Sequence, residues 1–398
     1  MNILFLTAST GGGHIKAAQA LMEHMEKNVP GCRTVLVDAL KYINPIADRL
    51  IAGTYLQTIK KAPNIYGKLY RLSEKSEAIT DLVKAINNRL APGLTRIFGN
   101  DPPDAIICTH TIPLQMVSYL KRNGITDIPV IGIVTDYTSH YFWKLNEPDA
   151  LIVAHERIKS DMARIGIDEN RIYAYGIPVS GRFKENCSRY DEPVYARTKK
   201  QTILLMGGSL GLCSMRDVFT SLLEIDYDIR IIAVTGHNFK LQTELNKLSD
   251  DSGKEVRVLG YTDDIYNLME NADIIITKPG GVTISEALIK KLPIFIMDPI
   301  PGQEERNAAF LIETGAARRL PEGKNLNSAI SSILDNPMML RWMSESAGKL
   351  AKLNACEDIT RLVTRMIWKD ESMIHKDTIF IPSANSRIHL GNRKISSM

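Results

Sequence analysis

Residues 272–307 constrain the fold more than any other stretch, because they alternate two short apolar segments with a helix-forming segment and polar loops. Ala272–Thr277 is rich in isoleucine and Pro293–Met297 is almost wholly apolar, as expected of strands buried on both faces of a parallel sheet. Thr283–Lys290, between them, consists largely of good helix formers. This order predicts a βαβ unit with two parallel strands.

Both strands are followed by loops suited to ligand binding. Lys278-Pro279-Gly280-Gly281 follows the first strand. Glycine lets backbone N–H groups approach a phosphate, and the start of the next helix favours an anion. The second loop carries Asp298, Gln303, Glu304, Glu305, Arg306 and Asn307. An ordinary crossover could contain the glycine pair alone, so the combination of the two loops indicates a site at the carboxyl ends of the strands.

The same succession of strand, glycine loop and helix opens both halves of the chain. Ile3–Thr7 precedes a loop at residues 9–14, and Thr202–Met206 precedes another at residues 207–211. Neither loop has the GxGxxG or GxxxxGK[ST] spacing of a dinucleotide or ATP cradle. Further strands are expected at residues 34–39, 105–109, 130–134, 151–154, 172–175, 229–234 and 256–259. The chain is therefore expected to be an α/β protein with two Rossmann-like halves.

The 398 residues are enough for two domains of ordinary size. We expect a first domain at residues 1–185 and a second at 200–350, joined by the polar stretch 184–200. A helix at 351–368 and a loose tail at 370–398 complete the chain, because the tail is polar and lacks periodicity.

The composition argues against metal sites, disulfide bonds, secretion and a membrane-spanning segment. The five cysteines are scattered with no CxxC pair, so neither a zinc site nor a disulfide framework is predicted. The N-terminus reads as a first strand rather than a signal peptide, and no run of about 18 apolar residues occurs. A reduced cytoplasmic compartment fits these features. No DxD pair stands in a suitable loop, so no metal is predicted.

Positive charge is concentrated in the first part of the chain. Residues 1–145 contain 16 Lys and Arg against 11 Asp and Glu, while the net charge of the whole chain is only +4. Within residues 46–72, tyrosine and apolar side chains alternate with Lys60, Lys61, Lys68 and Arg71. Such a mixture is typical of an anionic membrane surface, although a pair of amphipathic helices packed on the domain would look the same. No nucleic-acid-binding motif is present.

A family resemblance emerges from two motifs. KPGGVTISEA followed by PIPGQEERNA resembles the donor-binding segment of GT-B glycosyltransferases that make membrane glycolipids, namely the processive diacylglycerol glucosyltransferases and monogalactosyldiacylglycerol synthase. Peptidoglycan lipid II synthase is a more distant relative of these enzymes. The resemblance covers residues 1–365. It implies two Rossmann-like domains facing across a cleft, with the last helix returning to the first domain.

The resemblance also implies a site for a UDP-hexose donor in the second domain. Glu286 would bind the ribose, and the segment containing Tyr261 and Thr262 would cover the uracil. The remaining donor candidates are Gly208, Ser209, Gly281, Val282, Thr283 and Arg182 for the diphosphate, and Gln303, Glu304 and Asn307 for the hexose. The donor is a substrate, and no cofactor is expected.

In the first domain the same resemblance places the acceptor near His14. His14 follows three glycines at the start of a helix, where the helix dipole lowers the pKa of an imidazole and keeps it neutral, as a general base must be. Asp136, after the strand at 130–134, is the second candidate for the base or a partner of the histidine. Without the resemblance, His14 would read more readily as a capping or packing residue.

The implied reaction is an inverting transfer of glucose or galactose from the UDP-sugar to diacylglycerol or glycosyldiacylglycerol. The protein would then lie peripherally on the inner face of the cell membrane. A UDP-sugar 2-epimerase on the same fold and a non-catalytic nucleotide-sugar sensor are the alternatives. The sequence does not distinguish the two hexoses, which differ in one hydroxyl.

Overall fold

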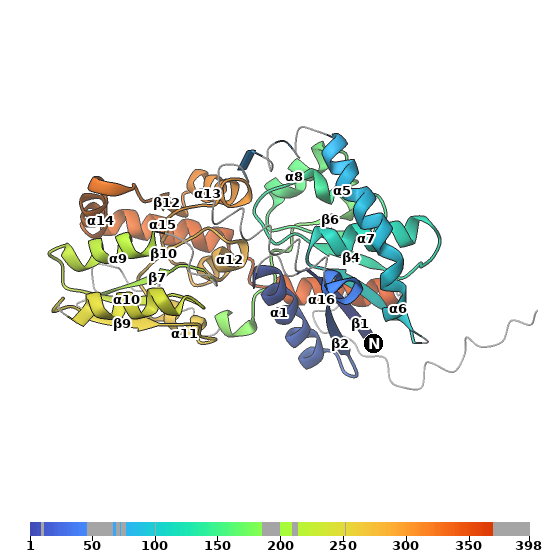
Figure 1. The fold of residues 1–398 in the computed structure, drawn as a ribbon, viewed down its shortest axis with the longest axis horizontal. Coiled ribbons are helices and arrows are strands. Elements are labelled where there is room, and N and C mark those ends of the chain that lie inside the picture. The colour runs from blue at the N-terminus through green and yellow to red at the C-terminus, as the bar shows by residue number, and fades with distance from the viewer. Residues whose placement is uncertain are drawn as a thin grey trace, which may run out of the picture.

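The computed structural model describes residues 1–8, 12–45, 67–68, 72, 77–99, 101–184, 200–208, 214–250 and 252–368. Within these residues two parallel β-sheets, each of six strands, form the centres of two α/β domains (Figure 1). The predicted pair of Rossmann-like domains is thereby confirmed. Ser209, most of the segment 46–72, most of the stretch 184–200 and the tail at 370–398 lie outside the described residues.

The first sheet has the strand order β2-β1-β3-β4-β5-β6. Its strands are β1 (Asn2–Thr7), β2 (Arg33–Asp38), β3 (Ala105–Cys108), β4 (Val130–Ile133), β5 (Ala150–Ile152) and β6 (Ile172–Tyr173). Alternate residues of β1 point to opposite faces. Ile3 and Phe5 belong to the core that includes buried residues of α1 (Gly12–Asn28), whereas Leu4 and Leu6 belong to the core that includes those of α7 (Thr111–Arg122).

Other helices of the first domain connect these strands. They are α2 (Ala39–Ile43), α5 (Glu77–Leu90), α6 (Thr95–Phe98) and α8 (Glu156–Arg164), with short 3₁₀ turns η1 (Ala91–Leu94), η2 (Tyr141–Trp143), η3 (Glu169–Arg171) and η4 (Gly181–Lys184). In α7, η2 and α8 the N-cap residue is a histidine whose Nδ1 accepts a hydrogen bond from the backbone two residues later. These caps fix the loops after β3, β4 and β5.

The second sheet has the order β12-β11-β10-β7-β8-β9. Its strands are β7 (Gln201–Met206), β8 (Ile229–Val234), β9 (Glu255–Leu259), β10 (Ile274–Thr277), β11 (Ile294–Ile296) and β12 (Ala317–Arg319). The helices are α9 (Met215–Glu224), α10 (Phe239–Asp250), α11 (Ile265–Glu270), α12 (Gly281–Ile289), α13 (Gln303–Glu313), α14 (Leu326–Leu334) and α15 (Pro337–Leu350), with η7 (Gly323–Asn325).

Helix α13 begins earlier than predicted. The sequence suggested a loop through Asn307, but the helix starts at Gln303. Gly302, with φ of 110°, is its N-cap, and Glu304 and Glu305 lie in the first turn, where the helix dipole favours acidic side chains. The predicted donor residues on this segment therefore stand on a rigid helix.

The last helix, α16 (Ala355–Trp368), packs on the first domain. Its residues Ile359 and Val363 share a core cluster with Ile3 and Phe5 of β1, and Figure 1 shows it beside α1. The strand order reverses between β1 and β3 in one sheet and between β7 and β10 in the other. In parallel sheets such switch points are where ligands bind, and the loops beyond them meet between the domains.

Candidate active site

His14 lies in the first turn of α1, after the loop that follows β1. Its Nδ1 is 2.8 Å from the carbonyl oxygen of Thr109 and 2.7 Å from Oγ1 of Thr135. A carbonyl oxygen only accepts, so Nδ1 carries the hydrogen and Nε2 has a lone pair when the ring is neutral. The ring of His110 meets His14 edge to face, with centroids 4.7 Å apart. The ends of three neighbouring strands thus select the tautomer that a general base requires.

The pKa of His14 is lowered from its ordinary value of 6.5. Burial of the ring is the largest cause, while the charge of Asp136 and the hydrogen bond to Thr109 act in the opposite direction. The sequence suggested the helix N-terminus as the cause, and the structure identifies burial as the main one. The ring is therefore neutral near pH 7.

Asp136 follows β4 of the first domain, and its side chain accepts hydrogen bonds from residues of the second domain. Its Oδ1 accepts hydrogen bonds from Nδ2 of Asn307 at 3.0 Å and from Nε2 of Gln303 at 3.3 Å. Burial raises the pKa of this carboxyl, and the neighbouring His14 and the bond from Asn307 oppose the rise. Two side chains of α13 are therefore directed at the second candidate for the catalytic base.

Asn307 is fully buried, with 0% of its surface exposed. Its Oδ1 accepts a hydrogen bond from the backbone N–H of Tyr137 at 2.8 Å, and its Nδ2 donates to Asp136 and to the carbonyl oxygen of Pro279. The resemblance implied that this residue contacts the hexose. In the structure these three hydrogen bonds all go to protein groups, two of them in the first domain.

The two domains also meet through Gly281, the first residue of α12. A Cβ atom at this position would lie 2.0 Å from the carbonyl oxygen of Thr135, so no other residue fits without displacing backbone. One turn further, Ser285 Oγ donates to the carbonyl oxygen of Gly281 and contacts the hydroxyl of Tyr137, each at 2.9 Å. The absence of a side chain at Gly281 therefore lets the two domains come into contact, in addition to any role in letting backbone N–H groups approach a phosphate.

Glu286 lies on α12 with only 8% of its surface exposed. Burial raises the pKa of its carboxyl to about 7, and the charge of Lys16 opposes the rise. Lys16 belongs to α1 of the first domain, and its Nζ lies 5.6 Å from the ring centroid of Tyr261. Sequence reasoning did not identify Lys16, although it follows His14 by two residues in the same helix.

Tyr261 and Thr262 follow β9 at the carboxyl edge of the second sheet. The Tyr261 ring stacks on His237 with a centroid distance of 4.5 Å and an interplanar angle of 9°, and it is 45% exposed. Its hydroxyl donates to Asp263 at 3.0 Å. Thr262 Oγ1 accepts a hydrogen bond from the backbone of Asp264. A partly exposed aromatic ring is therefore present where the uracil was predicted, and His237 was missed by the sequence reasoning.

The diphosphate candidates stand at the start of α12 and after β7. Val282 is buried and approaches Gly13 of α1, while Thr283 is partly buried in the first turn. Gly208 has a φ of 74°, and a Cβ there would meet nothing within 4 Å; this conformation favours glycine. The starts of α1 and α12 therefore face one another, which directs two helix N-termini to one place.

Glu304 is occupied in holding the loop before α13. Its carboxylate lies 3.3 Å from Nζ of Lys278 and accepts the N–H of Ile300 at 2.7 Å. Burial raises the pKa of Glu304, and the charge of Lys278 lowers it. In the same loop Asp298 has a φ of 39° and accepts a hydrogen bond from the backbone of Ser214. Strained backbone of this kind is common at functional loops.

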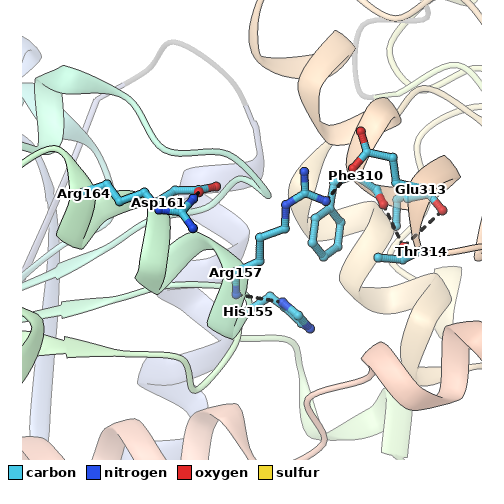
Figure 2. A network of polar contacts seen from close by, with 8 residues as sticks. His155, Arg157, Asp161, Arg164, Phe310, Glu313 and Thr314 are labelled. Atoms are coloured by element: carbon cyan, nitrogen blue, oxygen red, sulfur yellow. Dashed lines mark hydrogen bonds and ion pairs between the residues drawn. The ribbon is translucent and has the colours of Figure 1, made fainter.

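Arg182 and Arg157 make further contacts between the domains. Arg182 is exposed and lies 5.7 Å from the ring centroid of Tyr266 on α11. Figure 2 shows Arg157, on α8, reaching Glu313 at the end of α13, with an N–O distance of 2.5 Å. Both ion-pair partners are about half exposed, so this pair contributes about 0–1 kcal/mol. The buried contacts of Asn307 and Gly281 therefore fix the position of the two domains more firmly than this exposed ion pair does.

The described part of the chain contains neither a metal cluster nor a membrane-spanning helix. There, no group of three His, Cys, Asp or Glu side chains is placed to hold a metal ion. Among the same residues, no helix is both long and apolar enough to cross a membrane.

Comparison with known proteins supplies two families and several relatives. Residues 14–179 match the monogalactosyldiacylglycerol (MGDG) synthase family, and residues 202–360 match the glycosyltransferase family 28 C-terminal domain. The chain is 29% identical over 384 residues to a protein of Bacillus licheniformis named processive diacylglycerol beta-glucosyltransferase, with 94% of this chain and 97% of the relative covered.

Solved structures agree in fold. MurG of Acinetobacter baumannii matches with a TM-score of 0.63 at 17% identity, over 92% of this chain and 99% of that one. UDP-GlcNAc 2-epimerase from Neisseria meningitidis matches with a TM-score of 0.57 at 14% identity, over 92% and 100%. At these identities the likeness concerns the fold alone, and the fold is GT-B.

Proposed function

Because this chain is a GT-B glycosyltransferase that joins a domain of the MGDG synthase family to a family 28 C-terminal domain, we propose that it transfers a hexose from a UDP-sugar to diacylglycerol. The name of its Bacillus relative favours glucose and the name of its first domain's family galactose, so the proposal includes both. It acts peripherally on the inner face of the membrane, and glycosyldiacylglycerol is a second acceptor.

The observation that carries the proposal is the position of His14 between the domains. Its Nδ1–H is held by Thr109, so Nε2 is left to accept a proton. The acceptor hydroxyl oxygen attacks the anomeric carbon while its proton passes to Nε2. The bond from the anomeric carbon to the diphosphate breaks, and UDP leaves with the electron pair. Attack from the opposite side inverts the anomeric centre.

The second domain holds the donor and stabilises the charge that develops on the diphosphate. Backbone N–H groups at the start of α12, Thr283 and the loop with Gly208 and Ser209 serve this role, with Arg182 at the edge of the interface. Tyr261 and Thr262 cover the uracil and Glu286 binds the ribose. Gln303 and Glu304, in the first turn of α13, are the proposed contacts for the hexose, in addition to their bonds to protein groups; Asn307 lies one turn further along and is fully buried.

A donor panel tests the proposal. Purified protein is incubated with UDP-glucose, UDP-galactose or UDP-N-acetylglucosamine, with and without diacylglycerol in mixed micelles, and products are resolved by mass. Hexosyl-diacylglycerol, made only when both donor and lipid are present, is the expected result. Epimerised UDP-N-acetylglucosamine without lipid would indicate the epimerase, and donor binding with no product would indicate a sensor.

A further inference from the structure

The side-chain amide of Asn307 is engaged on both its nitrogen and its oxygen at the boundary between the domains. Both amide hydrogens are donated, one to Asp136 Oδ1 and one to the carbonyl oxygen of Pro279, each at 3.0 Å. The amide oxygen accepts the backbone N–H of Tyr137 at 2.8 Å. With no exposed surface, this side chain has the contacts of a structural junction.

This junction connects the acid beside His14 to the two helices that carry the donor candidates. Pro279 precedes α12, and Asn307 belongs to α13, whereas Asp136 and Tyr137 follow β4 of the first domain. The Asp136 charge in turn acts on His14. A displacement of α12 or α13 therefore changes the surroundings of Asp136 directly.

We propose that Asn307 is a positioning residue, which holds Asp136 in its place near His14 from across the boundary between the two domains. This inference rests on the proposed function, because it concerns the same transfer reaction. The donor-binding domain thereby completes the catalytic centre of the acceptor domain. The consequence is that the charge supporting His14 depends on a side chain of the domain that carries the proposed donor site.

The chemistry of the junction requires an amide. An aspartate at position 307 would present a second carboxylate to Asp136, and like charges at hydrogen-bond distance repel. It would also lose both donors while Asp136 and the Pro279 carbonyl remain buried, which is costly for unpaired polar groups. Gln303 donates a further hydrogen bond to the same Oδ1 of Asp136, at 3.3 Å, and this bond does not replace those of Asn307.

A double-mutant cycle tests the proposal. Single-turnover hexose transfer and calorimetric UDP affinity are measured for the wild type, Asn307→Ala, Asp136→Asn and the double variant. We expect Asn307→Ala to lower the transfer rate by about 10–100-fold with UDP affinity within about threefold. In the Asp136→Asn background the same substitution should cost less than about threefold, because residues that act through one another are not additive.

Ser285→Ala is the matched control, because it removes a bond across the same interface without touching Asp136. A rate loss equal to that of Asn307→Ala would overturn the proposal, since any interface bond would then suffice. The proposal would also be overturned if Asn307→Ala lost much of its UDP-hexose affinity but transferred hexose at the normal rate with saturating donor. Asn307 would then be a residue that binds the donor. Additive losses in the cycle would also overturn it, because Asn307 would then act independently of Asp136.

A spectroscopic readout separates this proposal from the proposed function. The ring nitrogens of His14 are followed by NMR in protein labelled at histidine. The ring of His14 contacts that of His110, and the charge of Asp136 acts on His14 and on Glu304, which is paired with Lys278. Because the bond from Asn307 lowers the pKa of Asp136, and the charge of Asp136 raises the pKa of His14, His14 should titrate at lower pH in Asn307→Ala.

This titration requires no product. If the wild type transfers no hexose to lipid, the proposed function fails, whereas an unchanged His14 titration in folded Asn307→Ala refutes the junction by itself. Should Asn307→Ala fail to fold, Asn307→Ser, which keeps one donor and a small volume, replaces it in both measurements.

Discussion

The two candidates for the general base, His14 and Asp136, differ in what their polar atoms already contact. Asp136 Oδ1 accepts two hydrogen bonds from α13, whereas the bond from His14 to Thr109 uses Nδ1 and leaves the Nε2 lone pair for a proton. A carboxylate whose oxygen is already bonded is better suited to support a base than to act as one. The geometry therefore favours His14 as the proton acceptor.

Substitution of His14 by alanine should lower single-turnover transfer by about 10²–10⁴-fold, the usual contribution of a general base. UDP affinity should be retained, because the proposed nucleotide site lies in the other domain. Since the pKa of His14 lies below 6.5, wild-type turnover should stay constant above that pH and fall only as the ring becomes protonated. Near wild-type transfer by His14→Ala, together with inactive Asp136→Ala, would make Asp136 the base.

Glu286 gives a prediction on both binding and stability. Its removal in Glu286→Ala should weaken UDP binding about tenfold or more, because charge-assisted bonds to a ribose contribute about 1.5–3 kcal/mol. An unchanged calorimetric affinity in a folded variant would exclude Glu286 from the site.

The same residue should make the unliganded protein less stable at high pH. Its pKa rises from 4.5 to about 7 on folding, so the folded state holds its proton more tightly. The contribution of this group to the free energy of unfolding is complete below pH 4.5. It is lost as the pH rises through 7, which lowers the free energy of unfolding by about 3 kcal/mol. Glu286→Gln, which cannot ionise, should therefore be more stable than the wild type at pH 8 but not at pH 4.5. Denaturant unfolding at both pH values measures this, and an equal difference at the two would refute it.

At the scale of elements, the start of α12 carries the closest approach of the domains. Gly281→Ala should stabilise an isolated helix by about 1 kcal/mol, but its Cβ would fall 2.0 Å from the Thr135 carbonyl oxygen. We expect the domains to separate there and the amide of Tyr137, bonded to Asn307, to exchange its hydrogen faster. Gly280→Ala is the control, because its Cβ meets nothing within 4 Å. Equal exchange in both variants would show that the interface absorbs the methyl group.

Most strands were predictable from the sequence, and the strand that was missed has little apolar pattern. The strands that became β1, β3, β4, β7 and β10 were expected within a residue or two, because strands buried on both faces are continuous apolar runs. β12 was missed, since Arg318 and Arg319 are exposed and only Ala317 is buried. The start of α13 was misplaced because its signal is the positive φ of Gly302, a backbone angle that the sequence does not reveal.

Some contacts of the candidate site could also be predicted from the sequence, and others could not. Residues after strands could be assigned to one sheet edge, which grouped His14 with Asp136 and Glu286 with Gln303. The contacts from Lys16 to Tyr261 and from Asn307 to Asp136 join different domains. They depend on how the two domains dock, which local sequence patterns do not encode.

At the scale of the whole molecule, charge is divided between the halves of the chain. Residues 1–145 carry 16 basic and 11 acidic side chains, whereas the remainder carries 33 and 34. Four of the basic residues, Lys60, Lys61, Lys68 and Arg71, belong to the segment rich in tyrosine. A surface cation near an anionic membrane contributes about 1 kcal/mol, so this small group could decide whether the protein binds.

We expect the wild type to co-sediment with vesicles containing phosphatidylglycerol, and to be released as salt shortens the Debye length from about 10 Å at 0.1 M to about 3 Å at 1 M. Glutamine at these four positions should lower the affinity by at least tenfold. The matched control places glutamine at the exposed Lys240, Lys247, Arg318 and Lys324 of the second domain, which changes net charge equally. Because attraction to a membrane depends on where the cations lie, the control should bind nearly as well as wild type. Equal losses in the two variants would mean that net charge alone governs binding, and equal retention would place the membrane contact in another part of the chain.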